Sequence, residues 1–417
     1  SGLLQVLIPP SEAIQSVSVS TGNYQAEFGR VGGAVTDIIL KSGTNDFHGA
    51  AYEFNRISAL QAKDYFQTGP NPVTVYNYYG GNLGGPIIRD KLFIFGDYLH
   101  VSDHQGQFNT ITVPTEAFRN GDFSAAPNNI YDPATGNSDG TGRTQFNYMG
   151  RANVMDPARI SPIAQKIMAL VPLPNVPGGG LSSNYTGVTH FIRKTNSFDV
   201  KADQNLRGED HLSVRYSWQK VDQDQQALFG LAGGPSHDGA HGTQTAYNTA
   251  ANYTHVFSPV LLTEVRLGLN HYKNIAKQHD YGSDASAAIG IPGVNVDPST
   301  SGLTGIDIAG FSSPIVGTGA SYPWVRGETN IDLVNNWTKI QGNHSLKFGA
   351  EVRRVRDDLQ QGQVFGQRGI FRYRDGQTGL KGGPKTGQAN DFASFLLDIP
   401  NQVGRDVGVQ DASWRES

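Results

Sequence analysis

The sequence of 417 residues contains no cysteine. This absence excludes a disulfide framework and any metal site built from thiolates, and it constrains the redox compartment only weakly. An oxidising compartment therefore remains open.

Long apolar runs are also absent. No stretch approaches the roughly 20 apolar residues that a membrane-spanning helix needs, which excludes an α-helical membrane protein. A β-barrel is not excluded, because each of its strands needs only about ten residues that alternate between lipid and lumen. Residues Ser1 to Pro10 lack the basic region and processing site of a signal peptide, so we expect either a mature chain or a fragment.

Neither sign of charge dominates. The formal net charge is -4 and no dense Lys/Arg run occurs, so the chain has no electrostatic footprint for nucleic acid. The 51 glycines and the mean hydropathy of -0.38 indicate turns and strands rather than a helical bundle.

Four hairpins with alternating apolar and polar residues follow along the chain. In the clearest strand, from His211 to Val221, Leu212, Val214, Tyr216 and Trp218 alternate with serine, arginine and glutamine residues. The strands expected to pair are 198–206 with 211–221, 245–257 with 260–273, 328–340 with 345–356, and 76–87 with 91–101.

Short turns and long connections alternate between these strands. In an antiparallel meander this places all short turns at one end of the sheet and all long loops at the other, which is typical of an outer-membrane barrel. A soluble sandwich also alternates, but its strands are usually shorter than the dozen residues expected here. Aromatic residues near strand ends fit interfacial girdles, although they also fit a core: Tyr52, Tyr79, Tyr98, Tyr247, Phe257, Tyr272 and Trp337.

A glycine-rich segment precedes the hairpins. Gly29, Gly32 and Gly33 permit unusual backbone conformations, the Ala34 to Leu40 run predicts a strand buried on both faces, and Ser42 to Asn45 predicts a turn.

Several longer stretches resemble the Oar-like branch of TonB-dependent outer-membrane receptors, and they cover nearly the whole chain in family order. They are QAEFGRVGGAVTDIILKSGTNDFHG, YNYYGGNLGGPIIRDKLFIFGDY, VPTEAFRNGDFS, IYDPATG, RISPIAQKIMALVPLPN, NSFDVKADQNLRGEDHLSVRYSW, GNHSLKFGAEVRR and DFASFLLDIP.

The resemblance implies an all-β fold, an antiparallel transmembrane β-barrel meander whose lumen is plugged by an N-terminal domain. On this basis we expect residues 1–46 to be the C-terminal part of the plug and residues 47–417 the N-terminal part of the barrel. The long external loops are expected near 58–75, 102–196, 222–244, 274–327 and 358–400.

The same resemblance implies a receptor that binds an external ligand and imports it with energy from the inner-membrane TonB complex. Its other partners would be the lipid and lipopolysaccharide of the outer membrane of a Gram-negative bacterium, and the ligand could be a glycan, a siderophore or a peptide. The TonB box, the signal peptide and most of the plug would precede Ser1, and nine complete strands plus the start of another would follow. We therefore expect an internal fragment that is not a competent transporter alone, because open sheet edges are unfavourable in a bilayer.

The 102–196 connection is expected to fold as a cap with one short helix at Ile160 to Leu170, begun by Ser161 and Pro162. It would serve either ligand capture or a purely structural lid.

We identify no catalytic, cofactor-binding or metal-binding residues. His237, Asp238 and His241 lie in a glycine-rich loop rather than on a helix that would align the histidines. The segment Asn137 to Gly140 resembles half a calcium loop but lacks the closing glutamate, so a turn is expected. The chain is therefore not expected to be an enzyme.

Two other functions stay open at this point. One is an outer-membrane interaction or export-assisting barrel of the Oar-like type, which would lack a TonB box. The other is a soluble carbohydrate-binding β protein, which would purify without detergent because it would lack outward rows of leucine and valine.

Glu27 and Arg30 are the candidate contacts between plug and barrel. They are spaced to reach the barrel wall or each other, and a surface pair of little energetic value is the alternative. On the family analogy they would contact charged lumen residues such as Arg215, Glu264 or Glu351.

We predict that Arg30→Glu in the full-length protein increases the passive leak of small solutes through the barrel, because it would repel the carboxylates that hold the plug closed. The measurement is efflux from proteoliposomes, and a leak equal to that of the unaltered protein would contradict the assignment.

Overall fold

The computed structural model describes residues 7, 9–22, 33–63, 65, 71–235, 239–319, 321–362, 364–374, 376–407 and 411–416. Within these ranges, every helix is too short or too polar to cross a membrane.

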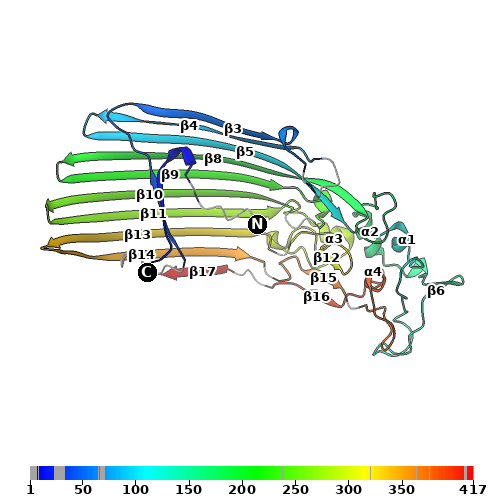
Figure 1. Ribbon diagram of the computed structural model, residues 1–417. Helices are drawn as coiled ribbons and strands as arrows, with labels where there is room; N and C mark the ends of the chain where they lie inside the picture. Colours follow the sequence, from blue (N-terminus) through cyan, green and yellow to red (C-terminus); the bar gives the residue numbers. More distant parts are fainter. Residues whose placement is uncertain are drawn as a thin grey trace.

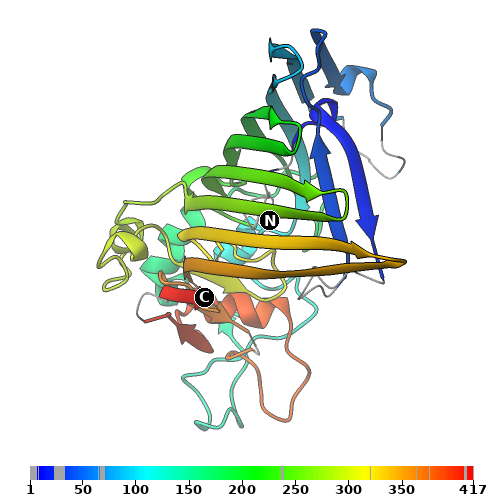
Figure 2. The same ribbon diagram turned by 90° about the vertical axis from the view of Figure 1, so that its left-hand side faces the viewer.

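One large antiparallel sheet of ten strands forms most of the molecule (Figure 1). In spatial order its strands are β3 (His48–Ile57), β4 (Thr74–Ile88), β5 (Leu92–Ile111), β8 (Tyr185–Arg207), β9 (Asp210–Gln225), β10 (Ala240–Ser258), β11 (Leu261–Gln278), β13 (Trp324–Gln341), β14 (His344–Gln361) and β17 (Asp411–Glu416). The sheet curves but does not close, and β3 and β17 are its edges (Figure 2). The predicted all-β antiparallel meander is confirmed.

All four predicted hairpins are present, as β4–β5, β8–β9, β10–β11 and β13–β14. Their turns lie together at the left end of the sheet in Figure 1, and the long connections lie at the other end. Two turns use left-handed residues, Asp90 with φ of 62° and Gly342 with φ of 59°. The predicted one-sided sorting of turns and loops is therefore confirmed.

The strands are longer than a dozen residues: β5 has 20 residues and β8 has 23. The connection predicted at 102–196 accordingly shrinks to residues 112–184. The extra length lies at the loop end, where ladder residues such as Asp222 and Asp224 are polar on the outer face. The alternation of apolar and polar residues stops there while backbone pairing continues, so the sequence pattern could not show the extra strand length.

The two faces of the sheet have an inverted burial pattern. We call the face that contacts residues 9–46 the inner face and the opposite one the outer face. Exposed residues of the outer face include Val200, Val214, Leu267, Leu269, Leu333 and Val352. Buried residues of the inner face include Asp97, Ser197, Asp199, Ser217, Gln219 and Asn274. Exposed apolar and buried polar side chains are expected where the outer face meets lipid rather than water.

Aromatic rows border the apolar outer face. Near the loop end, ladder partners across five strands form one row: Tyr98, Phe198, Trp218, Tyr247 and His271. Near the turn end, Phe257 stacks on Trp337 at 5.5 Å between ring centroids, and Trp337 stacks on Phe348 at 6.4 Å. Tyr247 and Phe257 are ten residues apart on β10, or about 33 Å along a strand and about 25 Å at a tilt of about 40°, the height of a barrel's apolar band.

Five of the seven aromatic residues proposed for the girdles lie on the outer face. Tyr52 and Tyr272 do not: the Tyr52 ring contacts Tyr78 at 5.8 Å between centroids on the inner face, and Tyr272 accepts a hydrogen bond from Asn274 there. The reason is the strict alternation of the strands, because both residues have the parity of the inner face.

Three long connections fold together into a cap at the loop end. Its elements are α1 (Glu116–Arg119), β6 (Asn147–Tyr148), β7 (Arg151–Ala152), η3 (Pro157–Arg159), α2 (Pro162–Ala169), α3 (Ala285–Ile289), η5 (Pro298–Thr300), β12 (Gly305–Ile308), β15 (Ile370–Tyr373), α4 (Gln388–Leu396) and β16 (Gln402–Gly404). One apolar core joins them, including Phe118, Phe123, Ile167, Ile306, Phe392 and Phe395. Two further short helices, η2 (Ser58–Leu60) and η4 (Gly230–Ala232), lie in the connections that follow β3 and β9.

The predicted cap helix is confirmed as α2, and the Ser161 side chain accepts hydrogen bonds from the backbone of Ile163 and Ala164. The 112–184 connection holds a second short helix, α1, which the sequence reading missed. The guanidinium group of Arg119, the last residue of α1, donates to the carbonyls of Pro114, Met168, Val171 and Pro172. It thereby ties α1 to the end of α2.

The N-terminal residues form η1 (Ser11–Ala13) and the antiparallel pair β1 (Ile14–Ser20) and β2 (Val35–Leu40), which crosses the inner face of the sheet (Figures 1 and 2). The predicted strand at 34–40 is confirmed, but its burial on both faces is wrong. Only Leu40 of β2 is buried, because β2 pairs with β1 in a two-stranded sheet and meets the wall at one end.

We predict that Leu267→Lys, on the outer face of β11, lowers the free energy of unfolding from lipid bilayers by about 2–4 kcal/mol, the cost of a lysine near the bilayer midplane. Asn270→Lys on the inner face of the same strand is the matched control and should cost much less. Tryptophan fluorescence during denaturant titration measures both, and equal costs would contradict the assignment of the faces.

Candidate functional site: the inner face of the sheet

The N-terminal segment touches the inner face through a small set of polar contacts. The carbonyl of Glu12 accepts a hydrogen bond from Asn82 Nδ2 at 3.2 Å, and the Glu12 carboxylate accepts one from the Tyr78 hydroxyl at 3.3 Å. Within the segment, Lys41 Nζ donates to the same Glu12 carbonyl at 2.7 Å. Lys201 Nζ on β8 donates to Ser42 Oγ at 2.6 Å. These contacts hold the segment against β4 and β8.

The apolar part of this contact is much smaller. It consists of Ala13, Leu40 and Phe95, with Ile14 packed beside them. Nearby, a Cβ on Gly43 would lie 2.4 Å from the carbonyl oxygen of Ile94, so only glycine permits this approach of the segment to β4 and β5. The described part of the segment is therefore held at a few points rather than by a broad apolar interface.

A row of polar side chains crosses the inner face at one level. Its members are direct ladder partners on seven successive strands: Asn82, Asp97, Asp199, Ser217, Asn248, Asn270 and Asn330. The Ser217 hydroxyl donates to the carboxylate of Asp199. Such a row gives the inner face a continuous line of hydrogen-bonding groups.

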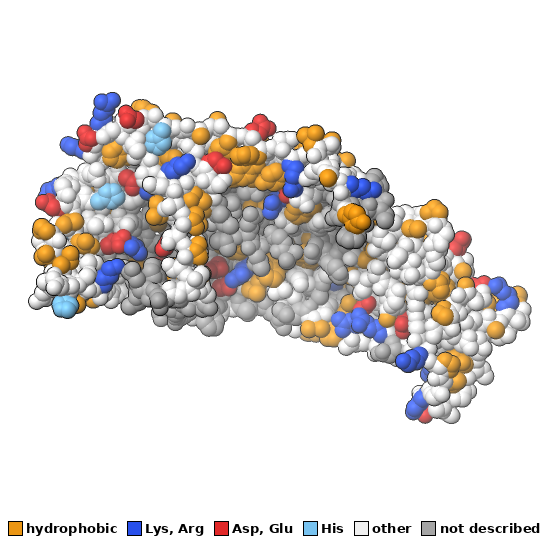
Figure 3. Space-filling view, viewed as in Figure 1, with side chains coloured by type: hydrophobic (Ala, Val, Ile, Leu, Met, Phe, Trp, Pro, Cys, Tyr) orange, Lys and Arg blue, Asp and Glu red, His pale blue; other side chains and the backbone are white. Residues whose placement is uncertain are grey.

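Charged residues lie next to this row and are mostly balanced within the wall. Arg353 contacts Asp332 at 2.5 Å and Glu351 at 2.7 Å, and Lys201 lies 3.5 Å from Asp203. In Figure 3, which views the inner face, acidic and basic side chains adjoin at several places.

The predicted contacts of Glu27 and Arg30 remain a prediction, because both residues lie outside the described ranges. Their proposed partners do lie on the inner face, and each has a contact within the wall. Arg215 donates to Asn248 at 2.6 Å, Glu264 accepts from Arg266, and Glu351 pairs with Arg353.

Sequence reasoning missed the contacts made by Lys41, Tyr78, Asn82 and Lys201. Lys201 carried the one usable signal, since a charged residue at an inward position of a barrel strand is available to a plug. The partners come from segments up to 159 residues apart, and no local pattern joins them.

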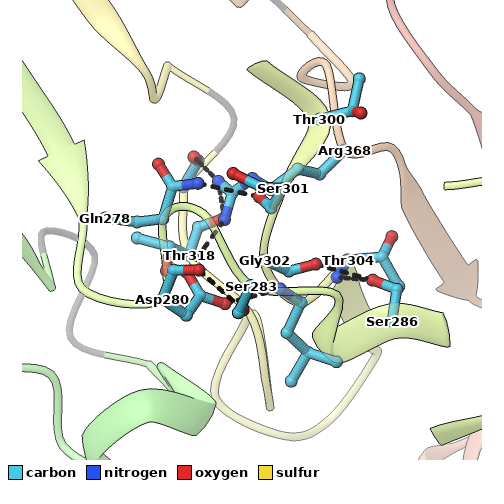
Figure 4. A network of polar contacts seen from close by, with 12 residues as sticks. Gln278, Asp280, Ser283, Ser286, Thr300, Ser301, Gly302, Thr304, Thr318 and Arg368 are labelled. Atoms are coloured by element: carbon cyan, nitrogen blue, oxygen red, sulfur yellow. Dashed lines mark hydrogen bonds and ion pairs between the residues drawn. The ribbon is translucent and has the colours of Figure 1, made fainter. Parts of the chain in front are cut away.

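A second polar cluster, shown in Figure 4, fastens the cap to the end of β11. The buried Arg368 donates to the carbonyls of Gly319 at 3.0 Å and Thr318 at 3.3 Å, and its Nη1 lies 4.0 Å from Asp280 Oδ1. Asp280 Oδ2 accepts from the Leu303 backbone at 2.6 Å. Burial raises the pKa of Asp280 and lowers the pKa of Arg368, while their mutual attraction opposes both shifts.

Two other segments were weighed as possible metal sites from the sequence: the loop with His237, Asp238 and His241, and the Asn137–Gly140 turn. His237 and Asp238 lie outside the described residues, and His241 is 3.8 Å from Asp224 at the start of β10. Asp139 is bonded by the Thr141 backbone and hydroxyl and by Lys381, and the Thr141 backbone is the largest of three contacts that lower its pKa to about 2. Its carboxylate is thus engaged in a turn.

Comparison with known proteins agrees with this architecture. A family model described as an outer membrane beta barrel domain matches residues 39–417. The chain belongs to that family. Its location is therefore the outer membrane of a Gram-negative bacterium.

One curated relative is the TonB-dependent transporter Oar of Myxococcus xanthus, which is 35% identical over 95 residues. The match covers 21% of this chain and 9% of that protein, so the chain spans a small part of the relative. The resemblance to TonB-dependent receptors is confirmed over this stretch.

Three solved structures show a partial similarity to this chain, each with a TM-score below 0.5. The transporter YddB of Escherichia coli gives a TM-score of 0.45 at 9% identity, covering 90% of this barrel chain and 38% of YddB. The ferric-catecholate import receptor Fiu of E. coli K12 gives 0.39 at 11% identity, covering 96% and 55%. The ferric enterobactin receptor PfeA of Pseudomonas aeruginosa, as a mutant, gives 0.36 at 12% identity, covering 85% and 43%.

We predict that Arg368→Met destabilises the barrel's cap by about 3–5 kcal/mol, because it leaves the buried Asp280 carboxylate without its cation. The double variant Asp280→Leu/Arg368→Met should recover most of this loss. Hydrogen exchange at the Leu303 and Thr304 amides reports cap stability, and additive losses in the double variant would show that the two residues act independently.

Proposed function

We propose that this chain is the plug end and the first part of the barrel of a TonB-dependent outer-membrane receptor. In this reading residues 1–46 belong to the plug, residues 47–417 belong to the barrel, and the cap faces the outside of the cell. The receptor binds an external ligand and imports it with energy from the inner membrane through TonB. It performs no chemistry on the ligand and needs no cofactor.

The contact between the N-terminal segment and the inner wall carries this proposal. Glu12 and Ser42 hold the segment to the wall by hydrogen bonds, and among the described residues the apolar contact consists of Ala13, Leu40, Ile14 and Phe95. A typical hydrogen bond contributes about 0.5–1.5 kcal/mol net. An interface of this kind is stable at rest yet can be pulled apart by a moderate force on the plug.

The polar row on the inner face supports the same function. Once the segment moves, Asn82, Asp97 and Asp199 would line the path it leaves with donors and acceptors that can replace a ligand's hydration. The cap, with its continuous apolar core, gives the external end a rigid surface for ligand capture. The ligand is a glycan, a siderophore or a peptide.

The alternative is a barrel of the same type that serves interaction or export without energy coupling. This alternative rests on the resemblance of the sequence to the Oar-like branch, and the presence or absence of a TonB box upstream of Ser1 distinguishes the two. A soluble carbohydrate-binding protein is excluded by the family and by the exposed apolar outer face.

We predict that energy coupling exposes residue 201. In the full-length protein, Lys201→Cys introduces a thiol into a sequence that contains no cysteine between Ser1 and Ser417, at a position covered by Ser42. In energised cells grown on medium that supplies the ligand, a maleimide dye should label this thiol several-fold faster than in cells treated with a protonophore.

Val296→Cys on the exposed surface of the cap is the control, since its labelling should not depend on energy. Equal labelling of residue 201 in energised and protonophore-treated cells would contradict the import function and favour the uncoupled alternative.

A further inference from the structure

Basic side chains gather on one part of the outer face, at the loop end of β11, β14 and β17. We call Lys273, Arg354, Arg356 and Arg415 the basic patch. All four are exposed, and the Arg356 and Arg415 side chains are 56% and 49% exposed. Arg356 lies directly opposite Arg415 in the ladder between β14 and β17.

The carboxylate of Asp358 binds two of the arginines in this patch but does not cancel the patch's net positive charge. Asp358 accepts from Arg356 Nε at 2.7 Å, from Arg415 Nη1 at 2.9 Å and from Ser413 Oγ at 2.5 Å. Two arginines placed directly opposite each other repel, and one carboxylate offsets only one of them. The arrangement therefore fixes the direction of two guanidinium groups and keeps a positive charge.

The patch also contains a recess. A shallow pocket of about 490 Å³ is lined by residues that include Lys273, Gly327, Asp358 and Ser413. Gly327 separates Lys273 from Asp358 in the ladder, and a Cβ at Gly327 would meet no atom within 4 Å. A group of moderate size can thus sit beside Lys273 and Asp358.

The level of the patch on the outer face is specific. Arg356 shares a ladder row with His271 of the aromatic row, and Arg354 shares the next row toward the turns with Leu269 and Ile331. The basic groups therefore begin where the apolar band ends. An anionic headgroup at this level would place its acyl chains along Leu269 and Ile331.

Other strands lack this excess of positive charge at the same level. Lys220 on β9 lies 3.1 Å from Asp222, which is also the ladder partner of Lys194. Asp224 lies 2.8 Å from His279. Acidic residues balance the basic ones there, so the excess is local to β11, β14 and β17.

We propose that the basic patch binds the phosphate groups of lipopolysaccharide in the outer leaflet. Guanidinium groups match phosphate oxygens in bidentate geometry, and the recess beside Lys273 accommodates the headgroup. The choice of the outer leaflet rests on the proposed function, in which the cap faces the outside.

The test uses the full-length protein, purified and freed of lipid, with fluorescent phosphorylated lipid A in mixed micelles. Each basic side chain near an anionic lipid surface contributes about a fivefold change in binding. Arg356→Gln/Arg415→Gln should therefore weaken lipid A binding about 25-fold. The matched control Lys194→Gln/Lys220→Gln should change it less than about twofold, because two carboxylates, Asp222 and Asp224, already balance those two lysines.

A second variant separates charge from folding. Arg356→Lys/Arg415→Lys keeps both charges and should bind lipid A within a few-fold of the unaltered protein, and heat-modifiability on gels checks that every variant is folded. Loss of binding in this variant as well, with the fold intact, would overturn charge recognition.

Two further comparisons identify the ligand's source. Dephosphorylated lipid A should bind the unaltered protein as weakly as phosphorylated lipid A binds the glutamine variant, and equal binding of the two lipids would overturn the proposal. Inorganic phosphate in large excess should compete only weakly, and displacement at concentrations comparable to lipid A would indicate a site for soluble anions. Energy-dependent labelling at residue 201 should be unchanged in the glutamine variant, so the import function is tested separately.

Discussion

The constraint on which the structure depends is that the sheet has lipid on one side and polar contents on the other. Its strands satisfy their backbone hydrogen bonds with one another, so each face is free to match its own surroundings. On the outer face Leu267 and Leu333 face each other in the ladder and are exposed. On the inner face Asp199 and Ser217 face each other and are buried. The aromatic rows mark both limits of the apolar band.

The N-terminal segment rests against the inner face of the sheet. The segment rests on a carbonyl of Glu12 and on the pair Ser42 and Lys201, with a small apolar contact around Phe95. The close approach at Gly43 gives this contact a defined position. Among the described residues, the contacts that hold the segment to the wall are few and mostly polar.

The cap is held together differently from the N-terminal segment. Residues from three separate connections share one apolar core around Phe118, Ile306 and Phe392, and the buried pair Asp280 and Arg368 joins this core to β11. A cap built in this way is a rigid platform. The described residues of the N-terminal segment and the cap are therefore held in different ways, the former by polar contacts at a few points and the latter by a shared apolar core.

The sequence by itself determined the hairpins, their turns and the parity of their faces, because period-two alternation acts locally along each strand. It also determined α2, through Ser161 and Pro162. Strand ends were not determined, since beyond the apolar band β8 and β9 continue with polar residues on the outer face. Only the tertiary structure decided which segments meet: Lys201 with Ser42, Asp280 with Arg368, and Arg356 with Arg415. Each pair joins positions far apart in the chain, and their meeting depends on the curvature and register of the whole sheet.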